Sequence, residues 1–436
     1  MTKDNGYKAW LRPAPPLRSS GKKALVIGAG LAGAASARAL AERNWNVIVT
    51  ERYPHPAGGA SGNPQAMLYA RLSPFHSPLS RLLLEGYVYS INRLSRMKTD
   101  LYQPCGLIQL PVKDGELRYQ QQLLACGQFQ AILAARTRSE LSRLSGIAIN
   151  RDGIWFPQAG WINPKALVAE LLDHPGIQLR ERTLVTDLRR TQDGWIAGTP
   201  QGEMAAAQVV VVACGHHSCQ LQQTAHLPLR SIGGQISMIP ATKASSALQT
   251  VLCGRGYVAP AVDGQHTLGA SFRLRDDWPG CRPQDHRDNL HNLMETAPGL
   301  ARALELDKLK SHWLTGRTSF RCTTPDYLPV VGPVMDVLRF RDSFSLLAKN
   351  ARSVIDSQVP WLEGLYINTG HGSRGLTTCL LASDILASQI SGEPGPVHED
   401  ISAALHPGRF PARALIRQSH PVRQKHPEAA PDRVEL

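Results

Sequence analysis

Cysteine pairs, long apolar runs and acidic residues are all scarce in this chain of 436 residues. Its 8 cysteines are scattered, with no CxxC pair and no histidine cluster at metal-ligand spacing, so we predict no metal site and expect reduced thiols in a cytoplasmic protein. No apolar run approaches the ~20 residues of a membrane span. Residues 1–20 also lack the apolar core of a signal peptide. We therefore expect no membrane partner, and a flexible lead-in over residues 1–20.

The shortage of acidic residues leaves the chain strongly basic. Lysine and arginine number 48 against 35 aspartate and glutamate, giving a formal net charge of +13. Such an excess attracts a polyanionic partner such as nucleic acid. The alternative is a generically basic surface with no such partner.

The most informative stretch runs from residue 24 to Glu51. A short apolar run, predicted to be a strand, leads into a turn with Gly28, Gly30 and Gly33, and an alanine-rich helix follows. A second β-branched run then ends on Glu51, 18 residues after Gly33. These glycines permit a tight turn, close approach of a pyrophosphate and close helix packing, and the acid accepts ribose hydroxyls. The pattern predicts a dinucleotide site without separating NAD from FAD.

Later segments of the chain are predicted to add strands to this nucleotide-binding unit. The apolar run at residues 209–212 indicates a buried parallel strand, and residues 364–369 indicate another. Between them, alternating patterns predict an antiparallel sheet in an inserted domain. The domains expected are nucleotide-binding at 21–100, 152–229 and 334–406, substrate-binding at 101–151 and 230–333, and a basic C-terminal arm at 407–436.

A second GxGxxG pattern occurs at residues 370–375. No strand ending in an acid follows its helix at the required distance, so we do not interpret it as a second nucleotide site. A helix N-terminus stabilises negative charge, and we expect this one to face a group that becomes negative during the reaction.

Four segments together resemble a known family. The opening fingerprint, the early GASGN loop with Gln65, residues 316–333 and the late GHGSRGL segment resemble FAD-dependent amine oxidases of the D-amino-acid and glycine oxidase type. Residues 59–73 and 316–333 are the most specific blocks. Among these oxidases, the chain is most similar to the flavin domain of bifunctional enzymes that complete 5-methylaminomethyl-2-thiouridine in tRNA, here without their methyltransferase domain.

The resemblance implies a fold, a cofactor and a reaction. The fold is α/β, with a discontinuous Rossmann-like FAD-binding domain and an inserted antiparallel-sheet substrate domain. The reaction is FAD-dependent removal of the carboxymethyl group from 5-carboxymethylaminomethyl-(2-thio)uridine at the tRNA wobble position, giving the aminomethyl nucleoside and glyoxylate. A small-molecule glycine or D-amino-acid oxidase is the alternative. Whether a separate methyltransferase acts on the product stays open.

The resemblance also suggests roles for individual residues. Arg321 is the expected clamp for the substrate carboxylate, with a structural ion pair to Asp326 as the alternative. Arg317 is a weaker candidate for the same role. His371 and Arg374 are further candidates for the catalytic site. The residues expected to bind FAD are Gly28, Gly30, Gly33, Glu51, Gly59, Ala60, Ser61, Gly62, Val185, Gly215, Gly372, Gly375 and Leu376.

Overall fold

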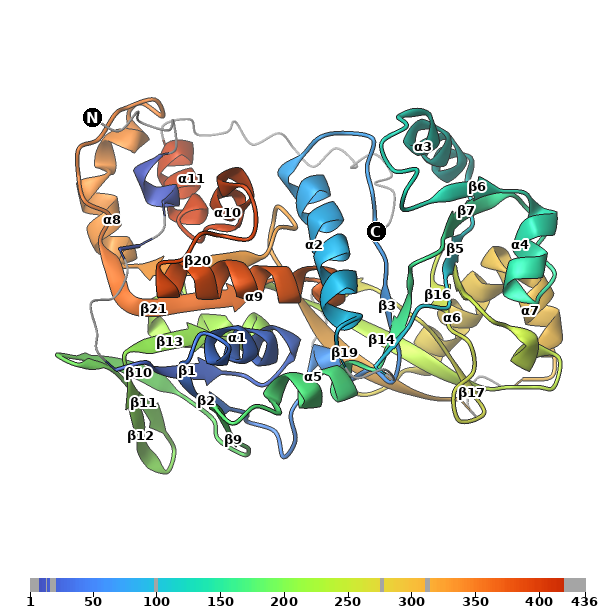
Figure 1. Ribbon diagram of the computed structural model, residues 1–436, viewed down its shortest axis with the longest axis horizontal. Helices are drawn as coiled ribbons and strands as arrows, with labels where there is room; N and C mark the ends of the chain where they lie inside the picture. The colour runs from blue at the N-terminus through green and yellow to red at the C-terminus, as the bar shows by residue number, and fades with distance from the viewer. Residues whose placement is uncertain are drawn as a thin grey trace.

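The chain folds into two adjoining halves, one built on each of two large sheets (Figure 1). A computed structural model describes residues 8–12, 14–15, 21–97, 101–274, 278–309 and 314–418. Its mixed sheets and helices confirm the predicted α/β class. Within these residues, no helix is long and apolar enough to cross a membrane.

The first half is a six-stranded sheet in which every pairing except that of β20 with β21 is parallel. This arrangement confirms the strands predicted at residues 24–27 and 209–212. In spatial order the strands are β20 Val330–Met335, β21 Trp361–Thr369, β13 Val209–Val212, β1 Lys23–Ile27, β2 Asn46–Thr50 and β9 Ile177–Arg180.

The central strands of this sheet are apolar because both faces are covered. Val26 and Val49 belong to the same buried cluster as residues of α1 Leu31–Ala41 and α9 Gly375–Ser391. Leu25 packs instead with Trp195, which lies in a small antiparallel sheet on the opposite face. That sheet comprises β10 Asp187–Thr191, β11 Gly194–Thr199 and β12 Gly202–Ala207, while α5 Pro164–Leu172 packs beside α1.

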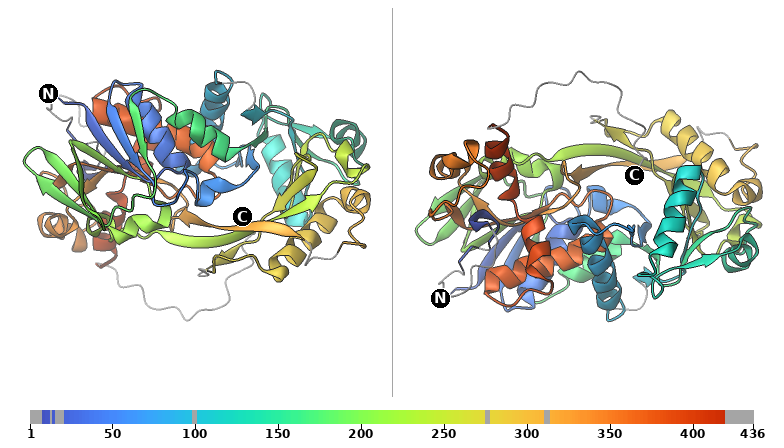
Figure 2. Two further views of the ribbon diagram at one scale, coloured as in Figure 1. Left: turned by 90° about the horizontal axis from the view of Figure 1, so that it is seen from below. Right: turned by 90° about the horizontal axis from the view of Figure 1, so that it is seen from above.

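The second half is a nine-stranded, mostly antiparallel sheet. Its two longest strands, β14 Arg230–Pro240 and β19 Thr315–Thr323, pair along their length and connect the two halves (Figure 2). The other strands are β5 Leu107–Gln109, β6 Ala134–Arg136, β7 Gly153–Phe156, β15 Val251–Cys253, β16 Tyr257–Val258, β17 Gln265–Gly269 and β18 Arg273–Leu274.

Helices complete both halves. Residues of α4 Arg138–Ser145, α6 Pro283–Thr296 and α7 Pro298–Ala303 form one buried cluster with strands of the second sheet. The amphipathic α2 Pro78–Leu94 packs against α9. The remaining α-helices and strands of the described residues are α3 Asp114–Ala125, α8 Val337–Ser343, α10 Glu399–Leu405, α11 Arg409–Gln418 and a sheet of β3 Ala66–Leu68, β8 Gly160–Ile162 and β4 Tyr102–Gln103.

Two predicted domain boundaries are displaced by one strand. Strand β7 pairs with β5, so it belongs to the second sheet and not to the nucleotide-binding half. Conversely, β20 pairs with β21 in the first sheet although most of it was assigned to the substrate domain. Both strands are short apolar segments, and only their pairing partners show which sheet they join.

The chain ends also differ from expectation. Residues 409–418 form α11, and Leu415 packs with Trp10 and Phe344 in a buried cluster. The start of the predicted C-terminal arm is therefore part of the folded core, because its apolar residues complete that cluster. Trp10, within the predicted flexible lead-in, is only 6% exposed. Residues 419–436 lie outside the described residues.

Candidate active site

The first glycine turn has the geometry that a dinucleotide requires. Gly28 has φ +103°, and a Cβ there would lie 2.7 Å from the Ala213 carbonyl oxygen. A Cβ on Gly33 would lie 1.8 Å from the Gly28 carbonyl oxygen, so α1 approaches the turn more closely than any side chain allows. The helix N-terminus is thereby placed to receive phosphates.

Glu51 lies against this turn, at the carboxyl end of β2, as predicted. It is 6% exposed. One carboxylate oxygen accepts the Ala29 N–H at 2.9 Å and the other accepts the Tyr53 N–H at 3.0 Å. From the early loop, Ser61 Oγ accepts the Leu31 N–H at 2.9 Å. The structure thus brings together the acid, the glycine turn and the early loop.

The early loop is anchored by Arg317. Its guanidinium donates to Asn63 Oδ1 at 3.1 Å, to the Gly58 carbonyl oxygen at 2.8 Å and to the carbonyl oxygen of Gly59. Burial lowers the pKa of this guanidinium. A Cβ on Gly62 would lie 2.5 Å from Arg317 Nη2, whereas at Gly59 it would meet nothing within 4 Å. These contacts favour an anchoring role for Arg317 over the predicted contact with substrate. Ala60, beside Gly59, is exposed.

Val185 and Gly215 both lie beyond the carboxyl ends of strands in the first sheet, Val185 after β9 and Gly215 after β13. The Thr183 N–H donates to the Glu51 carbonyl oxygen at 2.8 Å, which holds the segment of Val185 beside the acid. Val185 itself is buried with Ile27. Gly215 follows β13 with φ +60°. Both positions therefore adjoin the nucleotide turn, and their contact with a flavin stays a prediction.

The late glycine loop lies near the first one. Gly372, with φ +57°, donates its N–H to the Cys322 carbonyl oxygen at 2.7 Å. Gly375 begins α9, and a Cβ on it would lie 3.7 Å from Leu31 Cδ2 of α1. Leu376 is buried in the next position. The N-terminal ends of α1 and α9 are therefore adjacent, which fits one extended dinucleotide held by both loops.

A pocket that is open to solvent adjoins the late loop. It brings together Arg321, His371 and Arg374, the three residues predicted for catalysis. No aspartate or glutamate lines it among the described residues. Its walls are formed by Leu79, Leu83, Ile232, Phe272, Arg321, Thr323, Tyr327, Pro329, His371, Gly372, Ser373, Arg374 and Thr378.

Arg321 has the surroundings expected of a carboxylate clamp. Burial lowers the pKa of its guanidinium. One hydrogen bond holds the side chain, from Nη1 to the Ser271 carbonyl oxygen at 3.3 Å, and no carboxylate of the described chain pairs with it. The ion pair with Asp326 that was the alternative does not form, because Asp326 pairs with Arg409 and Arg413. A largely desolvated cation with donors to spare favours an anionic ligand.

His371 is held as a neutral, fixed ring. Its Nε2 lies 2.9 Å from Asn368 Oδ1 and its Nδ1 lies 2.8 Å from the Thr378 hydroxyl. The Asn368 amide nitrogen is engaged with Ser36 and Ser383. The proton of the ring therefore sits on Nε2, facing the Asn368 oxygen. Burial lowers the pKa of His371 to about 3. These contacts favour a positioning role over that of a base.

Arg374 is a second cation in the pocket wall. It occupies the N-cap of α9, where a positive charge is unfavourable next to the helix dipole. Burial and the nearby charge of Arg71 both lower the pKa of its guanidinium. No carboxylate of the described chain pairs with either arginine. Arg71 lies within residues 59–73, one of the two most specific blocks of the sequence.

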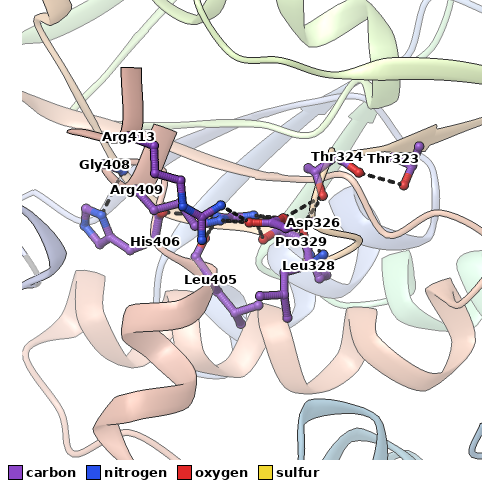
Figure 3. Close-up of polar contacts among 10 residues, drawn as sticks. All are labelled: Thr323, Thr324, Asp326, Leu328, Pro329, Leu405, His406, Gly408, Arg409 and Arg413. Atoms are coloured by element: carbon purple, nitrogen blue, oxygen red, sulfur yellow. Dashed lines mark hydrogen bonds and ion pairs between the residues drawn. The ribbon is translucent and has the colours of Figure 1, made fainter. Parts of the chain in front are cut away.

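The sequence did not reveal the buried cluster that supports the pocket wall (Figure 3). Arg409 is 4% exposed and donates to both Asp326 carboxylate oxygens, at 3.0 and 3.1 Å. It also donates to four carbonyl oxygens, those of Leu328, Pro329, Leu405 and His406. Burial alone would raise the pKa of Asp326, but Arg409, Arg413 and the Thr324 hydroxyl lower it to about 2.

Buried neutral histidines predict acid sensitivity. Burial lowers the pKa of His371 and of His406 to about 3, whereas an unfolded histidine titrates near 6.5. Below about pH 6.5 these histidines therefore bind protons in the unfolded chain but stay neutral in the folded chain. We expect the free energy of unfolding to fall by about 1.4 kcal/mol per pH unit for each such histidine as the pH drops towards 4.

Urea unfolding measured at pH 7, 6, 5 and 4 tests this expectation. An Asn replacement at His406 removes one titrating group and should flatten the curve between pH 6 and 4. A curve of unchanged slope in that variant would contradict the assignment of His406 as a buried neutral ring.

Comparisons with a family model and with known proteins agree on one family. The family model described as FAD dependent oxidoreductase matches residues 23–389. The chain is 45% identical over 421 residues to the tRNA 5-methylaminomethyl-2-thiouridine biosynthesis bifunctional protein MnmC of Chromobacterium violaceum, covering 95% of this chain and 63% of that protein. It is 42% identical to MnmC of Pseudomonas putida, covering 92% and 62%. The chain thus spans somewhat under two thirds of these relatives.

Solved structures share the fold at lower identity. Glycine oxidase from Geobacillus kaustophilus superimposes with a TM-score of 0.67 at 21% identity, covering 88% of this chain and 98% of that one. Iminodiacetate oxidase from Chelativorans gives a TM-score of 0.66 at 22% identity, covering 86% and 97%. At this identity the likeness shows the fold alone.

Proposed function

The chain belongs to the family of FAD-dependent oxidoreductases, and we propose that it removes the carboxymethyl group from 5-carboxymethylaminomethyl-(2-thio)uridine in tRNA. The observation that carries this proposal is Arg321, a largely desolvated cation in a pocket whose described lining residues include no carboxylate. The MnmC likeness and the net charge of +13 support RNA as the carrier of the substrate. A tRNA substrate implies a cytoplasmic enzyme.

The substrate group is an N-substituted glycine, so it offers a carboxylate to the pocket. We propose that Arg321 binds this carboxylate with two parallel N–H···O bonds. Such a fork fixes both the position and the plane of the carboxylate. The C–H bonds of the adjacent methylene group are thereby held in one orientation, which lowers the entropic part of the barrier.

The two glycine loops and Glu51 would hold FAD, and bound FAD supplies the acceptor for a hydride from that methylene carbon. For this step the substrate amine must be unprotonated. The positive charges of Arg321 and Arg374 disfavour its protonated form, and neutral His371 adds no charge. Loss of hydride and the N–H proton gives a C=N bond. Water adds to it, the C–N bond breaks, and the aminomethyl nucleoside and glyoxylate are released.

Anaerobic mixing of the holoenzyme with modified tRNA tests the proposal. Bleaching of the flavin absorbance by tRNA bearing the carboxymethylaminomethyl group, with one glyoxylate per flavin, is the expected result. Glycine, sarcosine and D-amino acids serve as parallel substrates. Bleaching by a free amine but not by the tRNA would overturn the proposal in favour of a small-molecule amine oxidase. Any role for a separate methyltransferase would begin only with the aminomethyl product.

Salt dependence provides an independent prediction. Each phosphate contact to single-stranded nucleic acid contributes about −0.7 to the slope of log K against log salt. With four such contacts, KM for tRNA should rise about 50-fold between 50 and 200 mM salt. Steady-state kinetics with an unmodified tRNA competitor as control measure this. A KM independent of salt would contradict an RNA substrate.

A further inference from the structure

Two aromatic rings are exposed in the wall of the pocket. Phe272 is 49% exposed and Tyr327 is 44% exposed, and both line the same pocket as Arg321 and Arg374. Large apolar side chains favour burial, so two rings held open to solvent around one cationic pocket need a reason. Neither ring has a part in the chemistry proposed above.

Tyr327 has a strained backbone conformation. Its φ is +59°, a left-handed conformation that disfavours side chains other than Gly, Asn and Asp. Its N–H donates to the Thr324 carbonyl oxygen at 3.2 Å. Asp326, clamped by Arg409, accepts the Leu328 N–H at 3.3 Å on the other side (Figure 3). The surrounding network therefore enforces a strained backbone that keeps the ring at the pocket wall, a pattern typical of functional positions.

Phe272 is also held by anchors on both sides. The preceding Ser271 donates its N–H to the Gln235 carbonyl oxygen at 3.0 Å, and its hydroxyl oxygen accepts the Gln235 N–H at 3.0 Å. The following Arg273 pairs with β14 and forms a buried ion pair of 2.8 Å with Asp285. The Phe272 ring therefore projects from a fixed support and not from a free loop. Rigid exposed aromatics are the residues that bind flat ligands with little entropic loss.

We propose that Phe272 and Tyr327 stack on bases of the single-stranded anticodon loop and so direct the wobble uridine substituent to Arg321. Single-stranded RNA is recognised by stacking of unpaired bases on aromatic side chains beside cationic groups. The pocket combines these two features with an absence of carboxylates among its described lining residues. This inference rests on the proposed function and adds the residues that recognise the RNA base.

Holoenzyme variants of both rings test the inference against an anticodon stem-loop RNA that carries the modification. Base stacking on one ring corresponds to an affinity change of about 10-fold. We expect Tyr327→Gly and Phe272→Leu each to raise Kd and KM for this RNA by about 10-fold, with kcat at saturating RNA changed less than about threefold. Tyr327→Trp keeps a stacking surface and should retain the wild-type Kd.

The glycine variant separates binding from folding. Glycine adopts φ +59° without strain, so Tyr327→Gly should unfold at the wild-type temperature or above it. Leu338→Ala, at a 67% exposed position on α8, is the matched control and should leave Kd unchanged. If wild type oxidises the RNA and both ring variants bind it as tightly, the stacking role is overturned and the proposed function stands. If wild type neither binds nor oxidises it, both are overturned.

Discussion

Replacing Arg321 by methionine should lower kcat/KM for the modified tRNA by about 30- to 5,000-fold, equivalent to about 2–5 kcal/mol. The reason is that the substrate carboxylate would enter a desolvated pocket with its main cationic partner removed. Lysine at this position keeps the charge but loses the fork, so Arg321→Lys should recover only part of the activity. Steady-state kinetics on flavin-saturated protein measure the effect.

Arg317→Lys is the matched control, because Arg317 lies on the same strand but is bound to the early loop. Its replacement should weaken FAD binding, seen by titration of the apoprotein with FAD, while KM for the RNA at saturating FAD stays within about threefold of wild type. The assignment of Arg321 as the carboxylate clamp would fail if the two variants changed the same parameter to the same extent.

Replacing Arg409 by methionine should lower the free energy of unfolding by about 3–5 kcal/mol. Arg409 is 4% exposed, and its loss leaves both Asp326 carboxylate oxygens and four carbonyl oxygens without their shared donor. Breaking one partner of a buried pair is costly because the other stays buried. Urea unfolding followed by tryptophan fluorescence measures the loss.

Arg413 offers an internal comparison for this second effect. It binds one of the two Asp326 oxygens that Arg409 binds, but its side chain is 48% exposed. Exposed ion pairs contribute about 0–1 kcal/mol, so Arg413→Met should change stability by no more than that. Equal losses in the two variants would show that burial of the guanidinium is not what makes Arg409 important.

Local sequence patterns predicted the nucleotide-binding half well. The first strand, the glycine turn, the helix and the second strand are close together in the sequence and contact one another. The spacing of Gly28, Gly33 and Glu51 was therefore enough to predict their arrangement. The apolar run at 209–212 was equally informative, because a strand buried on both faces has no polar alternation. The contacts of Glu51 and Ser61 with the turn agree with that prediction.

Several other expectations were incomplete because they depended on partners remote in sequence. The amphipathic pattern of residues 116–135 favours one continuous helix, but α3 ends at Ala125 and β6 begins at Ala134. The pattern of residues 178–188 favours one strand, but this segment contributes to β9 and β10, which belong to different sheets. In both cases the apolar or alternating pattern continues past the residue where one element ends. Contacts with a neighbouring sheet, and not the pattern, decide where that end lies.

The sequence by itself determined that this chain has a dinucleotide turn, a second glycine loop and an oxidase-type block at residues 316–333 that contains two arginines. Each of these is a short pattern that can be read locally. The tertiary structure decided which contacts each arginine makes. Arg317 and Arg321 lie four positions apart on β19, yet one anchors a loop and the other lines the pocket. Arg409, expected in a basic arm, is buried under that pocket. Burial and pairing depend on contacts between distant segments, and no local pattern encodes them.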